Sequence, residues 1–166
     1  MEVQVQKEHY LDNSATTQVL PQVAQMALHL MTEEYGNPSS LHTRGFRARK
    51  LVEEARAQVA QRLGAQPEEL TFTSGGTESN NLAIFGAAQA RRRLGNKIVT
   101  TAAEHDSVLA PCRALEKQGF QVVYLKPDAQ GRLSEQDLFE AIDSDTILVS
   151  VMLVNNETGA IFPVEA

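Results

Sequence analysis

Cysteine is nearly missing from this chain and tryptophan is missing entirely: 166 residues include one cysteine, Cys112, and no tryptophan. A single cysteine cannot form a disulfide within the chain or build a cysteine-based metal site. Cys112 falls on one helical face with Val108, Leu109 and Leu115. This spacing favours a buried thiol that behaves as a small hydrophobic side chain over a reactive one.

Long apolar runs and blocks of positive charge are also missing. No stretch approaches membrane-spanning length, and the first ten residues lack the apolar core of a signal peptide. The net charge of −6 is spread along the chain, which argues against nucleic acid or an anionic membrane as the main partner. A composition of 42% apolar and 22% charged residues is typical of a globular domain. We therefore expect a cytoplasmic globular protein.

The order of apolar patterns predicts an α/β fold. Two amphipathic helices come first, one marked by apolar positions at residues 19–31 and one at residues 51–63 that ends at Gly64. The loop between them, residues 35–42, leaves its polar side chains free for a binding role. Strands are then predicted at residues 70–73, 97–101, 121–125 and 146–151, and helices at 77–94, 106–118 and 135–142, the last with a capping box of Ser134 and Asp137. This alternation indicates a mainly parallel sheet with crossover helices.

The glycine pair Gly75-Gly76, between a predicted strand and a long helix, indicates an anion site. The first turn of a helix has backbone N–H groups without intrahelical partners, and glycine lets an anion approach them closely. Hydroxyl donors from Ser74, Thr77 and Ser79 lie around the same point. No lysine follows, and the spacing is not that of a dinucleotide loop, so a small monophosphate matches best. A glycine turn without a ligand remains equally compatible with the local sequence.

Two further polar positions follow predicted strands, where open α/β sheets bind ligands. His105 precedes a helix, and a neutral imidazole there could stack on a flat cofactor or move a proton. Asn156 could donate its amide hydrogens to a phenolic oxygen or a carboxylate. Taken singly, His105 could be only a polar residue at a helix start, and the Asn155-Asn156 pair only a turn. Together the motifs describe a site for a flat aromatic phosphate.

The chain contains five motifs in this order: YLDNSATT (10–17), GNPSS (36–40), TSGGTESNN (73–81), EH (104–105) and VNNETG (154–159). In order and spacing these motifs resemble the N-terminal part of NifS/IscS-type cysteine desulfurases, in the first of their two groups. The resemblance implies a fold-type I, pyridoxal phosphate (PLP)-dependent enzyme of the class V aminotransferases, with a partial three-layer α/β/α large domain of the aspartate aminotransferase type and a mainly parallel sheet. Residues 17–166 would belong to that domain, and residues 1–16 would form an arm associated with a small domain.

The same resemblance implies a role for each candidate residue. Gly76 and Thr77 would bind the PLP phosphate, His105 would stack on the pyridine ring and move protons, and Asn156 would hydrogen-bond near the cofactor O3′ and the substrate carboxylate. The implied reaction converts L-cysteine to L-alanine and leaves an enzyme persulfide. Its sulfur would pass to an acceptor or iron–sulfur scaffold protein. A homodimer is expected for the intact protein.

Three further parts of the family site are not found in this sequence. The family uses a lysine that holds PLP covalently, an aspartate at the pyridine nitrogen and a cysteine on a mobile loop. None of the five lysines lies in the family's Ser-x-His-Lys context, and Cys112 does not match the loop cysteine. We therefore expect this chain to be the first part of a longer protein and to be inactive alone. A selenocysteine lyase or related PLP homologue, or a non-catalytic scaffold or binding module, remains an alternative.

Overall fold

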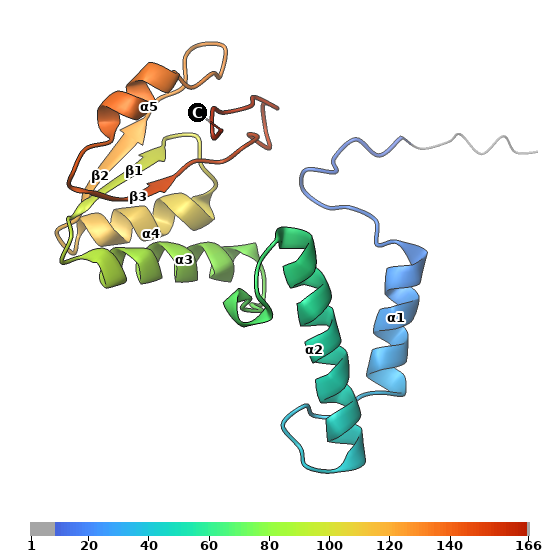
Figure 1. The fold of residues 1–166 in the computed structure, drawn as a ribbon. Helices are drawn as coiled ribbons and strands as arrows, with labels where there is room; N and C mark the ends of the chain where they lie inside the picture. Colours follow the sequence, from blue (N-terminus) through green and yellow to red (C-terminus); the bar gives the residue numbers. More distant parts are fainter. Residues whose placement is uncertain (1–8, 166) are drawn as a thin grey trace, which may run out of the picture. The chain divides into compact units, whose positions relative to one another are not determined.

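The computed structural model describes residues 9–165, and the chain divides into two compact units, Met1–Phe72 and Thr73–Ala166 (Figure 1). Half of the predicted N-terminal arm, residues 1–8, lies outside the described residues. The division of the arm from the large domain at residue 17 remains a prediction. Among residues 9–165, no helix is both long enough and apolar enough to cross a membrane.

The first unit is helical. Helix α1 spans Pro21–Thr32, helix α2 spans Thr43–Leu63, and a short 3-10 helix, η1, spans Pro67–Glu69. Proline suits the first position of α1 because the amide hydrogen it lacks would have no partner there. Helix α2 ends as predicted at Gly64, whose φ of 67° lies in the left-handed region that glycine adopts without strain.

The loop between α1 and α2 uses its polar side chains internally. The Asn37 Oδ1 accepts a hydrogen bond from the Ser39 N–H at 2.9 Å. The His42 Nδ1 accepts from the Gly45 N–H at 3.3 Å and so caps α2. The expectation that the polar side chains of this loop are free for binding is therefore wrong for Asn37 and His42, because the tight turn and the helix start need them.

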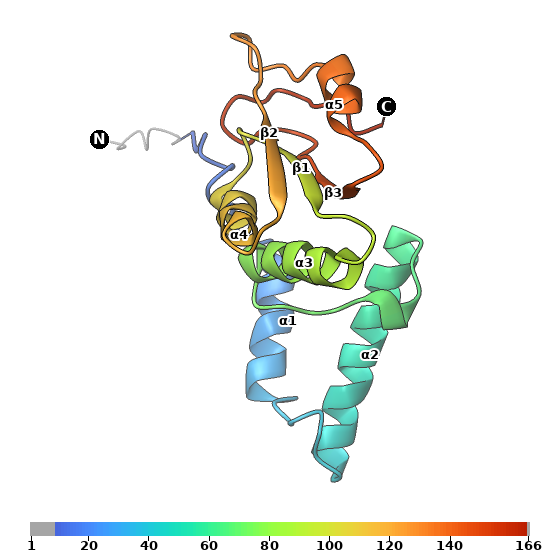
Figure 2. The same ribbon diagram turned by 90° about the vertical axis from the view of Figure 1, so that its left-hand side faces the viewer.

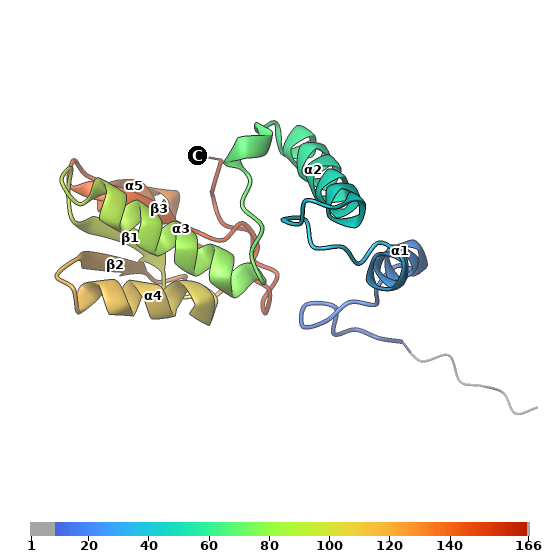
Figure 3. The same cartoon turned by 90° about the horizontal axis from the view of Figure 1, so that it is seen from below.

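The second unit is a parallel α/β sandwich. Strands β1 (Lys97–Thr101), β2 (Gln121–Leu125) and β3 (Thr146–Ser150) pair in the order β2-β1-β3, and both pairings are parallel. Helices α3 (Gly76–Arg91) and α4 (Asp106–Glu116) lie side by side on one face, and α5 (Glu135–Ala141) lies on the other (Figures 1, 2 and 3). The chain steps from β1 to β2 and back past β1 to β3, so right-handed crossovers must lie on opposite faces. The predicted α/β class, parallel sheet and three layers are confirmed.

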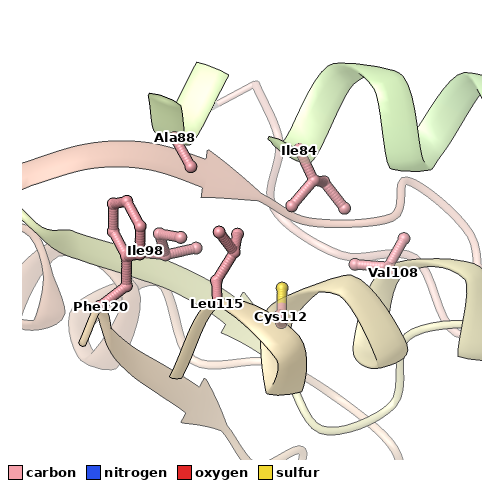
Figure 4. Packing of buried hydrophobic residues seen from close by; sticks show 7 residues of the cluster. All are labelled: Ile84, Ala88, Ile98, Val108, Cys112, Leu115 and Phe120. Carbon is pink, nitrogen blue, oxygen red and sulfur yellow. The ribbon is translucent and has the colours of Figure 1, made fainter. Parts of the chain in front are cut away.

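The core of this unit lies between the sheet and the α3–α4 layer (Figure 4). Every residue of the central strand β1 is buried. Cys112 is fully buried in this core, as its helical spacing predicts. The helix α5 begins at Ser134, whose hydroxyl accepts from the Asp137 N–H at 3.2 Å. The buried cluster consists of Ile84, Ala88, Ile98, Val108, Cys112, Leu115 and Phe120.

The strand predicted at residues 70–73 is not formed. Leu70 has extended backbone angles, with φ −96° and ψ 124°, but residues 70–73 pair with no other strand among the described residues. A strand depends on a partner for its backbone hydrogen bonds, and an apolar run alone does not supply one.

Candidate functional site

A depression of about 430 Å³ opens at the carboxyl ends of β1 and β3. Residues 102–106 line one side of it and residues 155–158 the other. The structure therefore brings His105 and Asn156, which lie far apart in the sequence, into one depression. Gly76 and Thr77 are not among its lining residues. The carboxyl ends of strands are where open α/β sheets bind ligands.

Glu104 ties the two sides of the depression together. Its Oε1 accepts from the Met152 N–H at 2.7 Å and from the Thr101 hydroxyl at 3.2 Å. Burial raises the pKa of Glu104, and these two hydrogen bonds act in the opposite direction. Because Thr101 ends β1 and Met152 follows β3, this carboxyl group fixes the loop that carries His105 against the segment that carries Asn156.

The two adjacent asparagines differ in burial and in hydrogen bonding. Asn155 is buried: its Nδ2 donates to the Ala103 carbonyl at 3.0 Å, and its Oδ1 accepts the N–H groups of Glu157 at 3.0 Å and Thr158 at 2.9 Å. Asn156 is exposed, and within residues 9–165 its side chain makes no hydrogen bond. Asn155 thus builds the turn that the sequence suggested, and the Asn156 amide is left available to a ligand.

The N-terminus of α3 is open at the glycine pair. A Cβ atom added to Gly75 or Gly76 would meet no atom within 4 Å apart from those of its chain neighbours and of the helix's own backbone. The N–H groups of the first helical turn, beginning at Gly76, have no intrahelical acceptor. The Thr77 hydroxyl makes no hydrogen bond within the described part of the chain. Backbone and hydroxyl donors therefore face open space at this helix end.

Two of the three hydroxyls expected around this helix end have other partners. The Ser74 N–H and hydroxyl both donate to Glu78 Oε2, each at 2.6 Å. The Ser79 hydroxyl bonds the Thr73 hydroxyl at 2.6 Å. The hydrogen bonds from Ser74 lower the pKa of Glu78. Only Thr77 keeps a free hydroxyl, so Ser74 and Ser79 shape the turn.

His105 caps helix α4 with one ring nitrogen. Its Nδ1 accepts from the Ser107 N–H at 3.1 Å and lies 2.8 Å from the Ser107 Oγ. A backbone N–H can only donate, so Nδ1 is the unprotonated nitrogen of the neutral ring and Nε2 carries the hydrogen. The His105 residue is exposed, so an Nε2–H donor and a ring face are presented to the depression.

The buried lysine of the sheet lies away from this site. The Lys97 Nζ is 2.9 Å from the Asp143 Oδ2, and Lys97 is the first residue of β1 whereas the depression lies beyond the last. Across residues 9–165, no three histidine, cysteine or acidic side chains are grouped to hold a metal ion.

Two residues that sequence reasoning missed join the candidate site to the helices. Asn80 on α3 and Ser107 on α4 hydrogen-bond to each other through the Asn80 Nδ2 and the Ser107 Oγ at 2.8 Å. They are 27 residues apart, and the periodicity of a helix or a strand does not predict a contact at that separation. The asparagines that follow the glycine pair were visible in the sequence, but their partners were not.

The fold and the depression together define an α/β protein with a candidate ligand site at the carboxyl ends of parallel strands. The chain belongs to the aminotransferase class-V family, whose model matches residues 9–166. It is 48% identical over 156 residues to the putative cysteine desulfurase IscS 1 of Bacillus subtilis (strain 168), covering 94% of this chain and 41% of that protein. It is 51% identical over 158 residues to cysteine desulfurase 2 of Trichormus variabilis, and this match covers 94% of this chain and 39% of that protein.

Solved structures give the same family. A NifS-like protein aligns with a TM-score of 0.88 and 41% identity, and the alignment covers 93% of this chain and 42% of the NifS-like chain. A structure described as SspA in complex with cysteine aligns with a TM-score of 0.86 and 40% identity, and the alignment covers 94% of this chain and 45% of the SspA chain. The predicted relationship to NifS/IscS-type proteins is confirmed, and this family is PLP-dependent. The chain spans about two fifths of the length of the curated relatives named above.

Proposed function

We propose that this chain is the N-terminal part of the PLP-binding large domain of a cysteine desulfurase. The intact enzyme converts L-cysteine to L-alanine and keeps the sulfur as a persulfide for an acceptor or iron–sulfur scaffold protein. The observation that carries the proposal is the shared depression of His105 and Asn156 in a chain 48% identical to a putative cysteine desulfurase. The relative solved in complex with cysteine supports L-cysteine as the substrate.

The residues at the start of α3 fit the phosphate of PLP. The Gly76 and Thr77 N–H groups and the free Thr77 hydroxyl are donors, and the space beside the glycines is open. The positive end of the helix dipole favours an anion at the same place. One carboxylate, that of Glu78, lies close by, but it is held by Ser74 through two hydrogen bonds. We assign the phosphate to Gly76 and Thr77.

His105 and Asn156 take the remaining roles. PLP, when bound, supplies the electron sink for cleavage of the substrate's carbon–sulfur bond. His105 offers a flat ring for stacking and carries a proton at Nε2, an atom free of protein partners among residues 9–165. The Asn156 amide, also free, donates to the region of the cofactor O3′ and to the substrate carboxylate. The homodimer stays a prediction of the sequence resemblance, and the cytoplasmic location stays a prediction of the amino-acid composition and the N-terminal sequence.

The test is a product assay on the intact protein that contains this chain. Incubation with PLP and L-cysteine is expected to give L-alanine and, with a thiol reductant, an equal amount of sulfide. L-selenocysteine is the comparison substrate, and the 166-residue chain alone is the control expected to give neither product. Alanine formation no faster than with PLP alone would refute the proposal, and exclusive use of selenocysteine would replace it with the lyase alternative.

A further inference from the structure

The hydrogen bonds behind His105 continue across two helices. Asn80 Nδ2 can only donate, so the Ser107 Oγ accepts from it at 2.8 Å. The Ser107 hydroxyl hydrogen is then directed to the His105 Nδ1, 2.8 Å away. With the Ser107 N–H at 3.1 Å, two donors from one residue meet the same ring nitrogen.

The same serine also connects to the proposed phosphate site. Asn81 Nδ2 donates to the Thr77 carbonyl at 2.8 Å and lies 3.4 Å from the Ser107 carbonyl. Ser107 is only 7% exposed, and α3 donates both to its hydroxyl, from Asn80, and to its carbonyl, from Asn81. The first turns of α3 and α4 are therefore linked through this one residue.

We propose that Ser107, supported by Asn80, is a positioning residue that fixes the tautomer and the plane of the His105 ring. This inference rests on the proposed function for the role of His105, but its geometry does not. With Nδ1 occupied by two donors, the neutral ring carries its hydrogen on Nε2 and cannot turn without losing both bonds. The chemistry at Nε2 is thus set by a serine and an asparagine that do not line the depression.

A matched comparison lies elsewhere in the chain. His42 also caps a helix, and its Nδ1 accepts from the Gly45 N–H at 3.3 Å. Within residues 9–165 no hydroxyl group hydrogen-bonds to the His42 ring. Capping alone therefore needs one donor, and the hydroxyl of Ser107 is an addition found at His105.

The test reads the tautomer directly, from the ring ¹⁵N chemical shifts of the chain labelled at its four histidines. In the wild type, His105 is expected as the Nε2–H form. Ser107→Ala should lower the ratio of the Nε2–H to the Nδ1–H form roughly fivefold, as expected for one lost hydrogen bond. Ser107→Thr should restore it, and Asn80→Ala should lower it less. Ser134→Ala, which removes the cap of α5, is the control and should leave the ratio unchanged.

An unchanged ratio in both Ser107→Ala and Asn80→Ala would overturn the inference. If Ser107→Ala does not fold, Asn80→Ala decides alone, since Asn80 is only partly buried. The measurement needs neither PLP nor substrate, so a shifted ratio supports the inference even if the product assay refutes the desulfurase. In an active intact enzyme, Ser107→Ala should lower kcat with little change in the KM for L-cysteine, because it disturbs proton handling and not substrate binding.

Discussion

Helix α1 in the first unit and helix α4 in the second have similar lengths, 12 and 11 residues, and both have an apolar stripe. Helix α4 buries its stripe against α3 and the sheet, and Leu115 is fully buried. Helix α1 has no buried residue, and Val23 and Met26 are 52% and 56% exposed. Amphipathic periodicity therefore predicts a helix in both units, but within residues 9–165 the apolar stripe of α4 is packed into a core and that of α1 is not.

The candidate site follows the same division. His105 and Asn156 in the depression, and the open helix start at Gly76 and Thr77, all belong to the second unit. A binding site needs side chains held in one geometry, and the closed core of this unit provides that support. If stability and ligand binding depend on the second unit, substitutions there should have larger effects than matched substitutions in the first unit.

The largest expected difference is in folding stability. Leu115→Ala should lower the free energy of unfolding by about 2–5 kcal/mol, because it opens a cavity in a packed core. Leu28→Ala in α1, where the residue is 58% exposed, should change it by less than about 0.5 kcal/mol. Denaturant unfolding followed by circular dichroism measures both. Equal losses from the two substitutions would show that α1 is packed as tightly as α4.

Thiol reactivity provides a second comparison. Burial, with the negative charges of Glu104 and Glu116, raises the pKa of the Cys112 thiol to about 11. At pH 8 its alkylation should be roughly 100-fold slower than that of a thiol with an ordinary pKa. A second cysteine introduced as Met26→Cys should react at the ordinary rate in the same molecule. Mass spectrometry of the alkylated chain separates the two sites, and rapid labelling of Cys112 would mean that the core opens readily.

Cofactor retention is expected to depend on Thr77. In the intact protein, Thr77→Ala should weaken PLP binding by about 1.5–3 kcal/mol, because it removes a hydrogen bond to a charged group. Thr32→Ala is a matched control in the first unit, where the hydroxyl donates to the Leu28 carbonyl at 2.8 Å. Equilibrium dialysis of PLP gives the affinities. No loss with Thr77→Ala would remove this residue from the phosphate site.

The smallest effect concerns Glu104. Glu104→Ala leaves the Met152 N–H without its acceptor and should cost about 1–3 kcal/mol, whereas Glu104→Gln keeps an oxygen for it. The pKa of Glu104 is higher in the folded chain than in the unfolded chain. The contribution of Glu104 to the free energy of unfolding is therefore complete below the unfolded-state pKa and is lost as pH rises through the folded-state pKa. Glu104→Gln should therefore show a smaller loss of stability across that interval. If the free energy of unfolding of the wild type rises with pH between these two pKa values, the pKa of Glu104 is lowered by folding and not raised.

Much of the second unit could be predicted because its signals are local. The apolar strands at β1, β2 and β3, the Ser134 cap and the burial of Cys112 all follow from patterns within a few residues. The strand expected at residues 70–73 failed because pairing depends on another segment. The Asn80–Ser107 bond was missed for the same reason.

Adjacent residues were also hard to separate from sequence. Asn155 and Asn156 have the same side chain, but one is 7% exposed and builds the turn while the other faces outward. Ser74 and Ser79 looked like further phosphate donors, and only the structure shows that they bond within the loop and the helix start. A sequence motif thus predicts where a site lies, but it does not show which of its residues face a ligand and which build the surrounding turn.

The most direct test of the central claim compares two histidines in the intact protein. His105 lines the depression in the second unit, whereas His29 lies on α1 with its Nδ1 3.4 Å from the Glu33 Oε1. L-Alanine formation from L-cysteine should fall by about 10²–10⁴-fold with His105→Ala, the range for a lost acid–base group. His29→Ala should leave the rate unchanged. Equal rates for the two variants would contradict the assignment of His105 to the reaction and with it the site proposed here.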